Sequence, residues 1–347
     1  MKRVKVLVID DSAVARKMIT EQLSSAEGIE IVGTALDPFI AAEKIKSLAP
    51  DVLTLDIEMP RMDGITFLSK LMIARPMPVI MVSAFTDKGA NATMKAMEAG
   101  AVDFILKPGA EGGPGEWSTF GRELAEKIHV AAEVHVRRKE GRPQPLLQKE
   151  PKKLVNSQVS PFVVAIGAST GGTEVITQIL TSLEENTPGV VITQHMPPKF
   201  TAAFAERIDS MSRISVKEAE NGDRVLVGHA YIAPGGTQML LRRDAEGFWI
   251  EVNDDPPVNR HKPSVDVLFT SVADSAGDNA MGIILTGMGN DGAYGLKLMR
   301  DENCVTIAQN EQSSIVFGMP REAIRNGAAV KIQNIEEIIG SVRALAR

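Results

Sequence analysis

Short runs of β-branched and other apolar residues alternate with segments of helical periodicity over residues 4–125. The first helical segment places Ala15, Ile19 and Leu23 at four-residue spacing beside Val14 and Met18, which gives an apolar stripe that can pack on a sheet. Because helices separate the strands, the strands should run parallel with right-handed crossovers, as in a doubly wound α/β domain. Five strands are predicted, at residues 4–9, 29–34, 52–55, 79–82 and 104–106.

The same alternation returns in the second half of the chain. Residues 1–125 form the first predicted domain, and residues 126–160 hold a helix end and then a linker rich in charge and proline. Basic residues in the linker would also fit a nucleic-acid-binding arm, but acidic residues interrupt them and aromatic residues are absent. Residues 161–347 form a larger, mostly parallel α/β domain, with strands predicted at 162–166, 189–194, 229–232, 281–285 and 305–308.

The composition indicates a globular protein that acts on proteins or small molecules. A chain of 347 residues, 44% hydrophobic and 24% charged, can bury two cores without disulfides. Its net charge of -6 argues against a dedicated nucleic-acid-binding protein. No apolar run approaches the ~20 residues that span a bilayer and no signal-peptide core follows the start, so we expect a cytoplasmic protein without membrane insertion. The single cysteine, Cys304, lies among apolar residues and is expected to be buried in a strand.

Polar side chains stand where four strands of the first domain end. Asp10 and Asp11 follow the first strand and Asp56 ends the third, while Ser83 and Lys107 close the fourth and fifth. Carboxyl ends of parallel strands share one edge of a sheet, so three carboxylates should crowd one crevice. A hard cation such as Mg²⁺ would relieve their repulsion. Taken singly, Asp11 fits a helix N-cap and Lys107 a solvated charge, but the joint placement favours a site.

This set resembles the receiver domain of two-component response regulators. The resemblance implies that Asp56 accepts a phosphoryl group from a histidine kinase. It also implies that Mg²⁺ binds Asp10, Asp11, Asp56 and the main-chain carbonyl of Glu58, and that Ser83 and Lys107 contact the phosphoryl oxygens. The segment 59–64, Met-Pro-Arg-Met-Asp-Gly, fits the loop that follows the phosphorylated residue in that family.

A predicted strand, a glycine-rich turn and a predicted helix follow one another at residues 162–180. The turn reads Gly-Ala-Ser-Thr-Gly-Gly over residues 167–172, and this context is typical of a G-x-S-x-G nucleophile turn with Ser169 exposed near a helix N-terminus. The same loop could instead hold a phosphate, although it lacks the P-loop lysine and the full dinucleotide pattern.

A base and a carboxylate are available at the same predicted sheet edge. His195 ends the strand after the serine turn, and Asp291 follows a later strand. A serine, a histidine and a carboxylate on converging strand ends predict a catalytic triad. Alone, His195 fits a loop residue and Asp291 an Asx-turn. The order Ser, His, Asp differs from that of α/β-hydrolases, so we expect a different topology.

Five segments together resemble the protein-glutamate methylesterase family of bacterial chemotaxis. The resemblance implies a triad of Ser169, His195 and Asp291, an oxyanion region at Thr170 and Met288, and a substrate cleft near His261 and Ser264. It further implies hydrolysis of glutamyl methyl esters on methyl-accepting chemoreceptors, with glutamine deamidation as a second activity and no cofactor for the esterase. The segments are residues 167–172, 194–197, 233–236, 259–266 and 286–292.

One chain that carries both a phosphoacceptor and a hydrolase suggests regulation. We expect the unphosphorylated receiver to pack over the cleft and phosphate at Asp56 to favour an open state. Two other functions fit parts of the sequence. One is a regulator that binds nucleotide at the glycine-rich loop, and the other is a DNA-binding regulator, which the lack of a basic helix-turn-helix segment disfavours.

Overall fold

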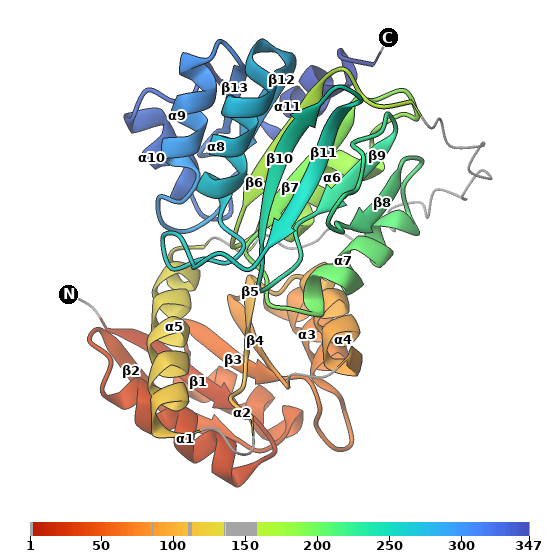
Figure 1. Ribbon diagram of the computed structural model, residues 1–347. Helices are drawn as coiled ribbons and strands as arrows, with labels where there is room; N and C mark the ends of the chain where they lie inside the picture. Colours follow the sequence, from red (N-terminus) through yellow and green to blue (C-terminus); the bar gives the residue numbers. More distant parts are fainter. Residues whose placement is uncertain (1–2, 85–86, 110–112, 135, 137–157, 347) are drawn as a thin grey trace. The chain divides into compact units, whose positions relative to one another are not determined.

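The computed structural model describes residues 3–84, 87–109, 113–134, 136 and 158–346. The chain divides into two compact units, Met1–Arg142 and Pro143–Arg347, whose elements are labelled in Figure 1. Most of the predicted linker lies outside the described residues. Within the described part of the chain, no helix is both long enough and apolar enough to cross a bilayer.

The first unit is built on a parallel five-stranded sheet in the order β2-β1-β3-β4-β5. The central strands β3 and β4 are buried along their whole length, as expected for a sheet covered on both faces. The predicted α/β class is confirmed here, and each predicted strand is present within one residue at each end. The strands are β1 (Val4–Ile9), β2 (Ile29–Ala35), β3 (Val52–Asp56), β4 (Val79–Ser83) and β5 (Asp103–Leu106).

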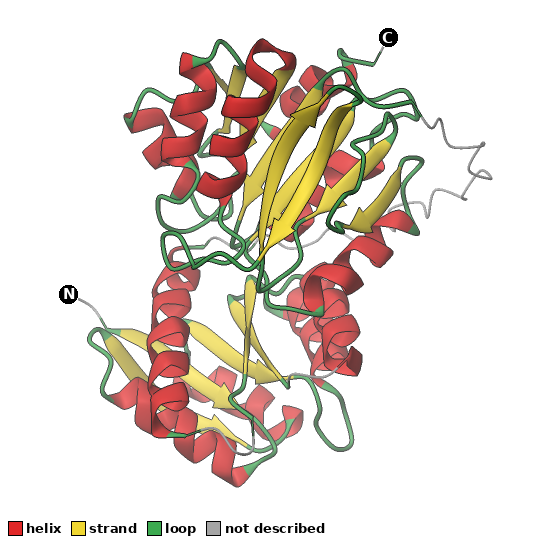
Figure 2. Cartoon of the chain, in the orientation of Figure 1, coloured by secondary structure: helices red, strands yellow, loops and turns green. Residues whose placement is uncertain are grey.

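Five helices follow the strands of this sheet, with α1 packed against α5 and α3 against α4 (Figures 1 and 2). Ser12 caps α1, and its predicted stripe of Ala15, Ile19 and Leu23 is buried. Val14 does not belong to that stripe, because it is 72% exposed on the opposite side of the helix. The helices are α1 (Ala13–Ser24), α2 (Pro38–Leu48), α3 (Gly64–Ala74), α4 (Asp87–Ala99) and α5 (Pro114–Glu133).

The second unit is built on a parallel seven-stranded sheet in the order β14-β13-β12-β6-β7-β9-β8. Its central strands β12, β6 and β7 are completely buried, which explains why each reads as an unbroken apolar run. The strands are β6 (Val163–Ala168), β7 (Gly189–Gln194), β8 (Ser215–Glu218), β9 (His229–Ile232), β12 (Ala280–Ile284), β13 (Val305–Gln309) and β14 (Lys331–Gln333).

Four strands of this unit escaped prediction. The edge strands β8 and β14 are short and only partly buried. The antiparallel hairpin of β10 (Gln238–Asp244) and β11 (Gly247–Asn253) lies outside the large sheet, and β10 packs against α8. Each strand of the hairpin has only three consecutive apolar residues, at 239–241 and 248–250, so neither shows the longer apolar run of a strand buried on both faces.

The helices of the second unit form two groups. Helix α8 packs on α9, and α9 on α10, while α6 contacts both α7 and α11 (Figure 1). Cys304 is buried, as expected, one residue before β13, and burial raises the pKa of its thiol to about 11. The helices are α6 (Gly172–Thr181), α7 (Phe200–Asp209), α8 (Val265–Ala276), α9 (Ala293–Asp301), α10 (Met319–Arg325) and α11 (Ile335–Arg343), with a 3₁₀ turn at Gly277–Asn279.

Gly167 near the end of β6 provides a test of this packing. A Cβ at this position would lie 2.1 Å from Val265 Cγ1, so Gly167→Ala should overpack the core and cost about 1–3 kcal/mol of unfolding free energy. Gly340→Ala in α11 is the control, because nothing lies within 4 Å of its added Cβ. That change should stabilise the helix by roughly 0.5–1 kcal/mol. Denaturant unfolding measures both, and equal effects would contradict the described contact.

Candidate functional site

The serine turn lies at the carboxyl end of β6, between the ends of two neighbouring strands. The N–H of Ser169 donates to Thr286 O at 3.1 Å, which ties the turn to the loop after β12. On the other side, the Gln194 side chain donates to Ser169 O at 3.0 Å. The Ser169 carbonyl also accepts from Gly172 N at 2.7 Å. The backbone of the turn is therefore fixed from both neighbouring strands.

Two glycines allow this tight arrangement. Gly171 has φ +78°, and a Cβ there would meet Ile315 at 2.7 Å. At Gly287 a Cβ would stand 2.8 Å from Ser169 Cβ. Larger residues at these positions would therefore push the serine out of place.

His195 stands next to the serine turn because β6 and β7 are in register. Ala168 pairs with Gln194, and the N–H of His195 donates to Ala168 O at 3.1 Å. Its side chain is 8% exposed. The Nε2 atom lies 2.7 Å from Asp291 Oδ2, whereas the buried Nδ1 atom has no hydrogen-bond partner among the described residues.

The Asp291 carboxylate is buried at the N-terminus of α8. Its Oδ2 accepts from the N–H of Val265 at 2.7 Å, and its Oδ1 from the N–H of Asp266 at 3.2 Å. The side chains of Asn259 and Ser264 both donate to Oδ1 at 2.8 Å. Helix N-termini favour negative charge, so this carboxylate sits where an anion is stabilised.

These contacts decide the charge of Asp291. Burial alone would raise its pKa, but the hydrogen bond and charge of His195, with the donors Asn259 and Val265 N–H, bring the pKa far below its ordinary value. An ionised Asp291 accepts a hydrogen bond from Nε2–H, so it holds His195 in the tautomer whose Nδ1 can act as a base.

The residues predicted as a triad thus come from the ends of three adjacent strands, β12, β6 and β7. The histidine and the carboxylate are hydrogen-bonded. Within the described part of the chain, the Ser169 hydroxyl makes no hydrogen bond to His195, although their backbones are neighbours. Such contacts often tighten only when substrate is bound.

Of the two residues predicted for the oxyanion region, Thr170 belongs to the serine turn and Met288 to the loop after β12. Thr170 is buried, and its carbonyl accepts from the Thr286 hydroxyl at 3.0 Å. Met288 follows Gly287 in the loop after β12, and Gly318 packs closely on its Cα. Thr170 follows Ser169 directly. Met288 lies two residues after Thr286, whose carbonyl accepts from the N–H of Ser169.

The residues predicted for the substrate cleft contact the histidine–carboxylate pair itself. The rings of His261 and His195 are stacked, with centroids 3.6 Å apart and planes 10° apart. Ser264 is buried and donates to Asp291. Sequence reasoning missed Asn259, whose amide donates to both Asp291 and Asp266, and the latter contact measures 2.7 Å. Its place in the segment 259–266 was the available signal.

A hollow of about 510 Å³ opens beside α8. Asn259 and Asp266 line it together with Asn290, the residue before Asp291, and the exposed Tyr294. Burial and the charge of Asp291 raise the pKa of Asp266. The hollow therefore borders Asn259 and Asp266, two residues that contact Asp291.

The acidic residues of the first unit also come together as predicted. Carboxylate oxygens of Asp10, Asp11 and Asp56 all lie within 4.8 Å of one another. Lys107 Nζ stands 2.7 Å from Asp10 and 2.9 Å from Asp56. Ser83 is buried at the end of β4.

This donor set fits a magnesium ion. Three clustered carboxylates supply the hard oxygen ligands that Mg²⁺ prefers, and exposed Asp11 leaves one side open to water. Glu58 lies in the loop two residues after Asp56. Burial, partly offset by Lys107, raises the pKa of Asp56 to about 6. Although burial opposes it, the charges of Asp56 and Asp10 raise the pKa of Lys107.

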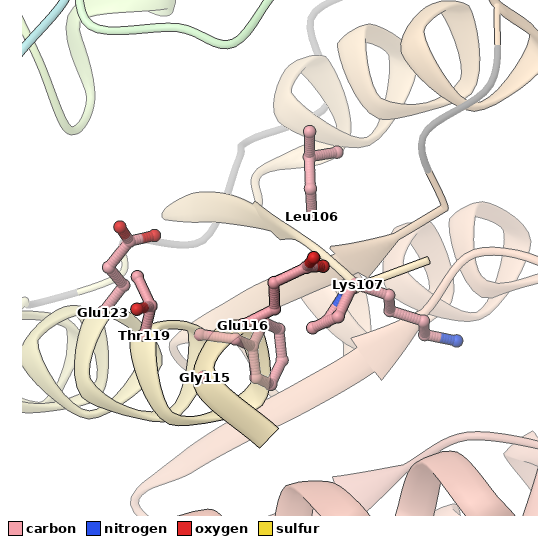
Figure 3. A pocket seen from close by; sticks show the side chains of 8 residues that line it. Leu106, Lys107, Gly115, Glu116, Thr119 and Glu123 are labelled. Carbon is pink, nitrogen blue, oxygen red and sulfur yellow. The ribbon is translucent and has the colours of Figure 1, made fainter. Parts of the chain in front are cut away.

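The first unit has a hollow of about 330 Å³, which adjoins this cluster at Lys107. Figure 3 shows Lys107 extending away from Glu116, Thr119 and Glu123, which line the hollow from α5. The Lys107 ammonium contacts the carboxylates of Asp10 and Asp56, which do not line the hollow, so the hollow is distinct from the carboxylate cluster.

Two protein families match the chain. The family model described as CheB methylesterase matches residues 164–342, and that of the response regulator receiver domain matches residues 6–112. The solved catalytic domain of the CheB methylesterase of Thermotoga maritima is 35% identical, with a TM-score of 0.52, and covers 54% of this chain and 100% of its own.

Curated relatives match nearly the whole chain. A protein-glutamate methylesterase/protein-glutamine glutaminase 1 of Geobacter metallireducens is 49% identical over 345 residues, 96% of this chain and 94% of its own. The protein-glutamate methylesterase/protein-glutamine glutaminase of Salmonella typhimurium is 51% identical over 340 residues, 97% of this chain and 95% of its own.

A receiver joined to a hydrolase is therefore the class of this protein. The chain belongs to the CheB methylesterase family and carries a response regulator receiver domain. The family resemblance seen in the sequence motifs is confirmed, as are the two-domain α/β fold and the enzyme class.

The raised pKa of Asp56 predicts a pH-dependent stability. Between pH 3.8 and about 6 the folded state holds a proton that the unfolded state has lost, so rising pH costs stability. We expect Asp56→Asn to gain on the order of 2 kcal/mol in metal-free buffer at pH 7. The gain should vanish below about pH 4, where both states are protonated.

Calorimetry of the full chain between pH 4 and 8 measures this effect. Asp11→Asn removes the same charge from an exposed position and should change stability by less than about 0.5 kcal/mol. A gain for Asp56→Asn that is the same at pH 4 and pH 7 would contradict this explanation.

Proposed function

We propose that the second unit hydrolyses glutamyl methyl esters on chemoreceptors, with Ser169, His195 and Asp291 as its catalytic triad. The observation that carries this proposal is the His195–Asp291 hydrogen bond of 2.7 Å, which leaves a buried Nδ1 beside the serine turn with no hydrogen-bond partner in the described part of the chain. The names of the relatives support methylated protein glutamates as the substrate, and the resemblance to the chemotaxis family suggests chemoreceptors. We assign the triad from the positions of these three residues.

The reaction begins when His195 Nδ1 takes the proton of the Ser169 hydroxyl as its oxygen attacks the ester carbonyl carbon. Ionised Asp291 stabilises the imidazolium that forms. Backbone N–H groups near Thr170 and Met288 stabilise the oxyanion. Methanol leaves with the proton from His195, and water then releases glutamate from the acyl-serine. When the substrate is glutamine, ammonia leaves instead of methanol, which gives the deamidase activity.

The first unit is proposed to take a phosphoryl group from a histidine kinase at Asp56. Asp10, Asp11, Asp56 and the Glu58 carbonyl would hold Mg²⁺, which when bound neutralises charge as phosphate arrives. Ser83 and Lys107 would hold the phosphoryl oxygens. The carboxylate cluster and the position of Lys107 between two of its members support these roles.

Phosphorylation is proposed to regulate hydrolysis. One chain contains both sites, so a change of state in the first unit can alter the population of active second units. The proposed domains are the receiver at residues 1–125, the helix end and linker at 126–160, and the catalytic domain at 161–347. The proposed place of action is the cytoplasm, with chemoreceptors and a histidine kinase as partners.

Loss of the nucleophile tests the esterase. Ser169→Ala should lower methanol release from methylated receptor by at least about 10³-fold, because the triad acts as a unit. Ser182→Ala is the matched control, because this hydroxyl only donates to Gln178 O at the end of α6. Gas chromatography of released methanol measures both. An active Ser169→Ala enzyme would exclude the proposed mechanism and favour a nucleotide-binding role for the glycine-rich loop.

Loss of the phosphoacceptor tests the regulation. With Mg²⁺ and acetyl phosphate, the wild-type chain should release methanol faster, whereas Asp56→Asn should not respond. Asp51→Asn, which changes a carboxylate that accepts from Lys5 N, should respond like the wild type. A phosphodonor without effect on the wild-type rate would argue against regulation through Asp56.

A further inference from the structure

A two-residue turn at Val258–His261 reaches both members of the histidine–carboxylate pair. The N–H of His261 donates to Val258 O at 2.8 Å, and the N–H of Val258 donates to His261 O at 3.1 Å. Asn259 and Arg260 lie between them with φ of 52° and 69°. Positive φ at both central positions defines a type I′ turn, in which asparagine is favoured.

Buried Gln238 anchors this turn to the protein. Its Nε2 donates to Pro256 O at 3.1 Å and to His261 O at 3.4 Å, and its Oε1 accepts from Ser264 N at 2.9 Å. The N–H of Gly236 also donates to Lys262 O at 3.1 Å. The turn is therefore held on both sides and can act as a fixed support.

The His195 ring needs such a support. One hydrogen bond at Nε2 fixes a point of the ring and leaves its plane free to rotate about that point. Nδ1 has no hydrogen-bond partner among the described residues to restrict this rotation. The stacked ring of His261, 3.6 Å away, restricts the plane instead. Proton transfer from a serine requires Nδ1 to point at the hydroxyl, so a fixed plane favours reaction.

The same turn also fixes the other partner. Asn259 Nδ2 donates to Asp291 Oδ1 at 2.8 Å and to Asp266 Oδ2 at 2.7 Å. One amide thus bridges the carboxylate of the pair and a second carboxylate that is anchored by Gly295 N at 2.7 Å. The bridge stops Asp291 from rotating away from His195.

We propose that the turn Val258–His261 positions the general base of this enzyme, with His261 fixing the plane of the His195 ring and Asn259 fixing the Asp291 carboxylate. Neither side chain exchanges a proton with the substrate, so both are positioning residues. The proposal rests on the proposed function, because it assigns a role in that reaction. It adds Asn259 to the site and gives His261 a positioning role in place of the predicted role in the substrate cleft.

The stacked ring is tested by two substitutions in the full chain. His261→Ala should lower kcat about tenfold to a hundredfold with KM nearly unchanged, because only the orientation of the base is lost. His261→Phe keeps a flat ring and should retain kcat within about threefold of the wild type. The substrate is a peptide that carries a glutamyl γ-methyl ester, and methanol release is measured.

A second histidine supplies the matched control. His229 is the first residue of β9, at the opposite end of the parallel sheet from Ser169, and its ring stacks on Tyr231. His229→Ala and His229→Phe should leave kcat unchanged. Normal activity of His261→Ala, or equal loss in His261→Ala and His261→Phe, would overturn the role of the flat ring.

The carboxylate contact is tested by two glycine substitutions in the same turn. Glycine accepts positive φ, so Asn259→Gly and Arg260→Gly keep the turn and remove only a side chain. Asn259→Gly should lower kcat about tenfold, whereas Arg260→Gly should not. Equal activity of the two variants would overturn the role of Asn259. This pair, with His261→Phe, also decides the matter if His261→Ala fails to fold.

Ser169→Ala, assayed in parallel, separates this proposal from the proposed function. If Ser169→Ala is active, both are overturned. If Ser169→Ala is inactive while every variant of the turn has wild-type kcat, only the positioning role is overturned.

Discussion

The proposed chemistry of the second unit depends on one buried negative charge. An isolated carboxylate in a protein interior is costly and usually takes up a proton instead. Asp291 avoids this because the first N–H groups of α8, two side-chain donors and His195 surround it. Ser264 precedes α8 but gives its hydroxyl to Asp291 rather than capping the helix. A carboxylate from a distant loop thus takes over the N-terminal capping of α8 and remains ionised.

The two units solve the same electrostatic problem in opposite ways. In the second unit, donors from the helix end lower the pKa of a buried aspartate. In the first unit, burial raises the pKa of Asp56 despite the adjacent ammonium of Lys107. A buried carboxylate whose pKa is raised by its surroundings is stabilised when a cation binds it or when a modification changes its charge. This contrast agrees with the proposed roles of Asp291, whose charge would stay constant during hydrolysis, and of Asp56, which would change state.

The sequence was sufficient to predict the strands that are buried on both faces and the candidate site residues at their ends. The strands β1, β7 and β9 begin and end where the apolar runs predict, and the residues after β6 and β7 are the serine and histidine of the site. The hairpin of β10 and β11 could not be predicted from unbroken apolar runs, since its strands are only partly buried. The stacking of His261 on His195 was also beyond prediction, because a turn far along the chain brings the two rings together.

The pairing of β6 with β7 limits the insertions and deletions that this protein can accept. His195 Nδ1 is the ring nitrogen nearer to the main chain, so little side chain lies between the backbone and the atom proposed as the base. Ala168 and Gln194 are paired directly before the serine and the histidine, so strand register sets the separation of these two residues. A single-residue insertion or deletion within β7 would reverse the direction of every following side chain. We therefore expect variation in length to be tolerated in the loops beyond the sheet and not within these two paired strands.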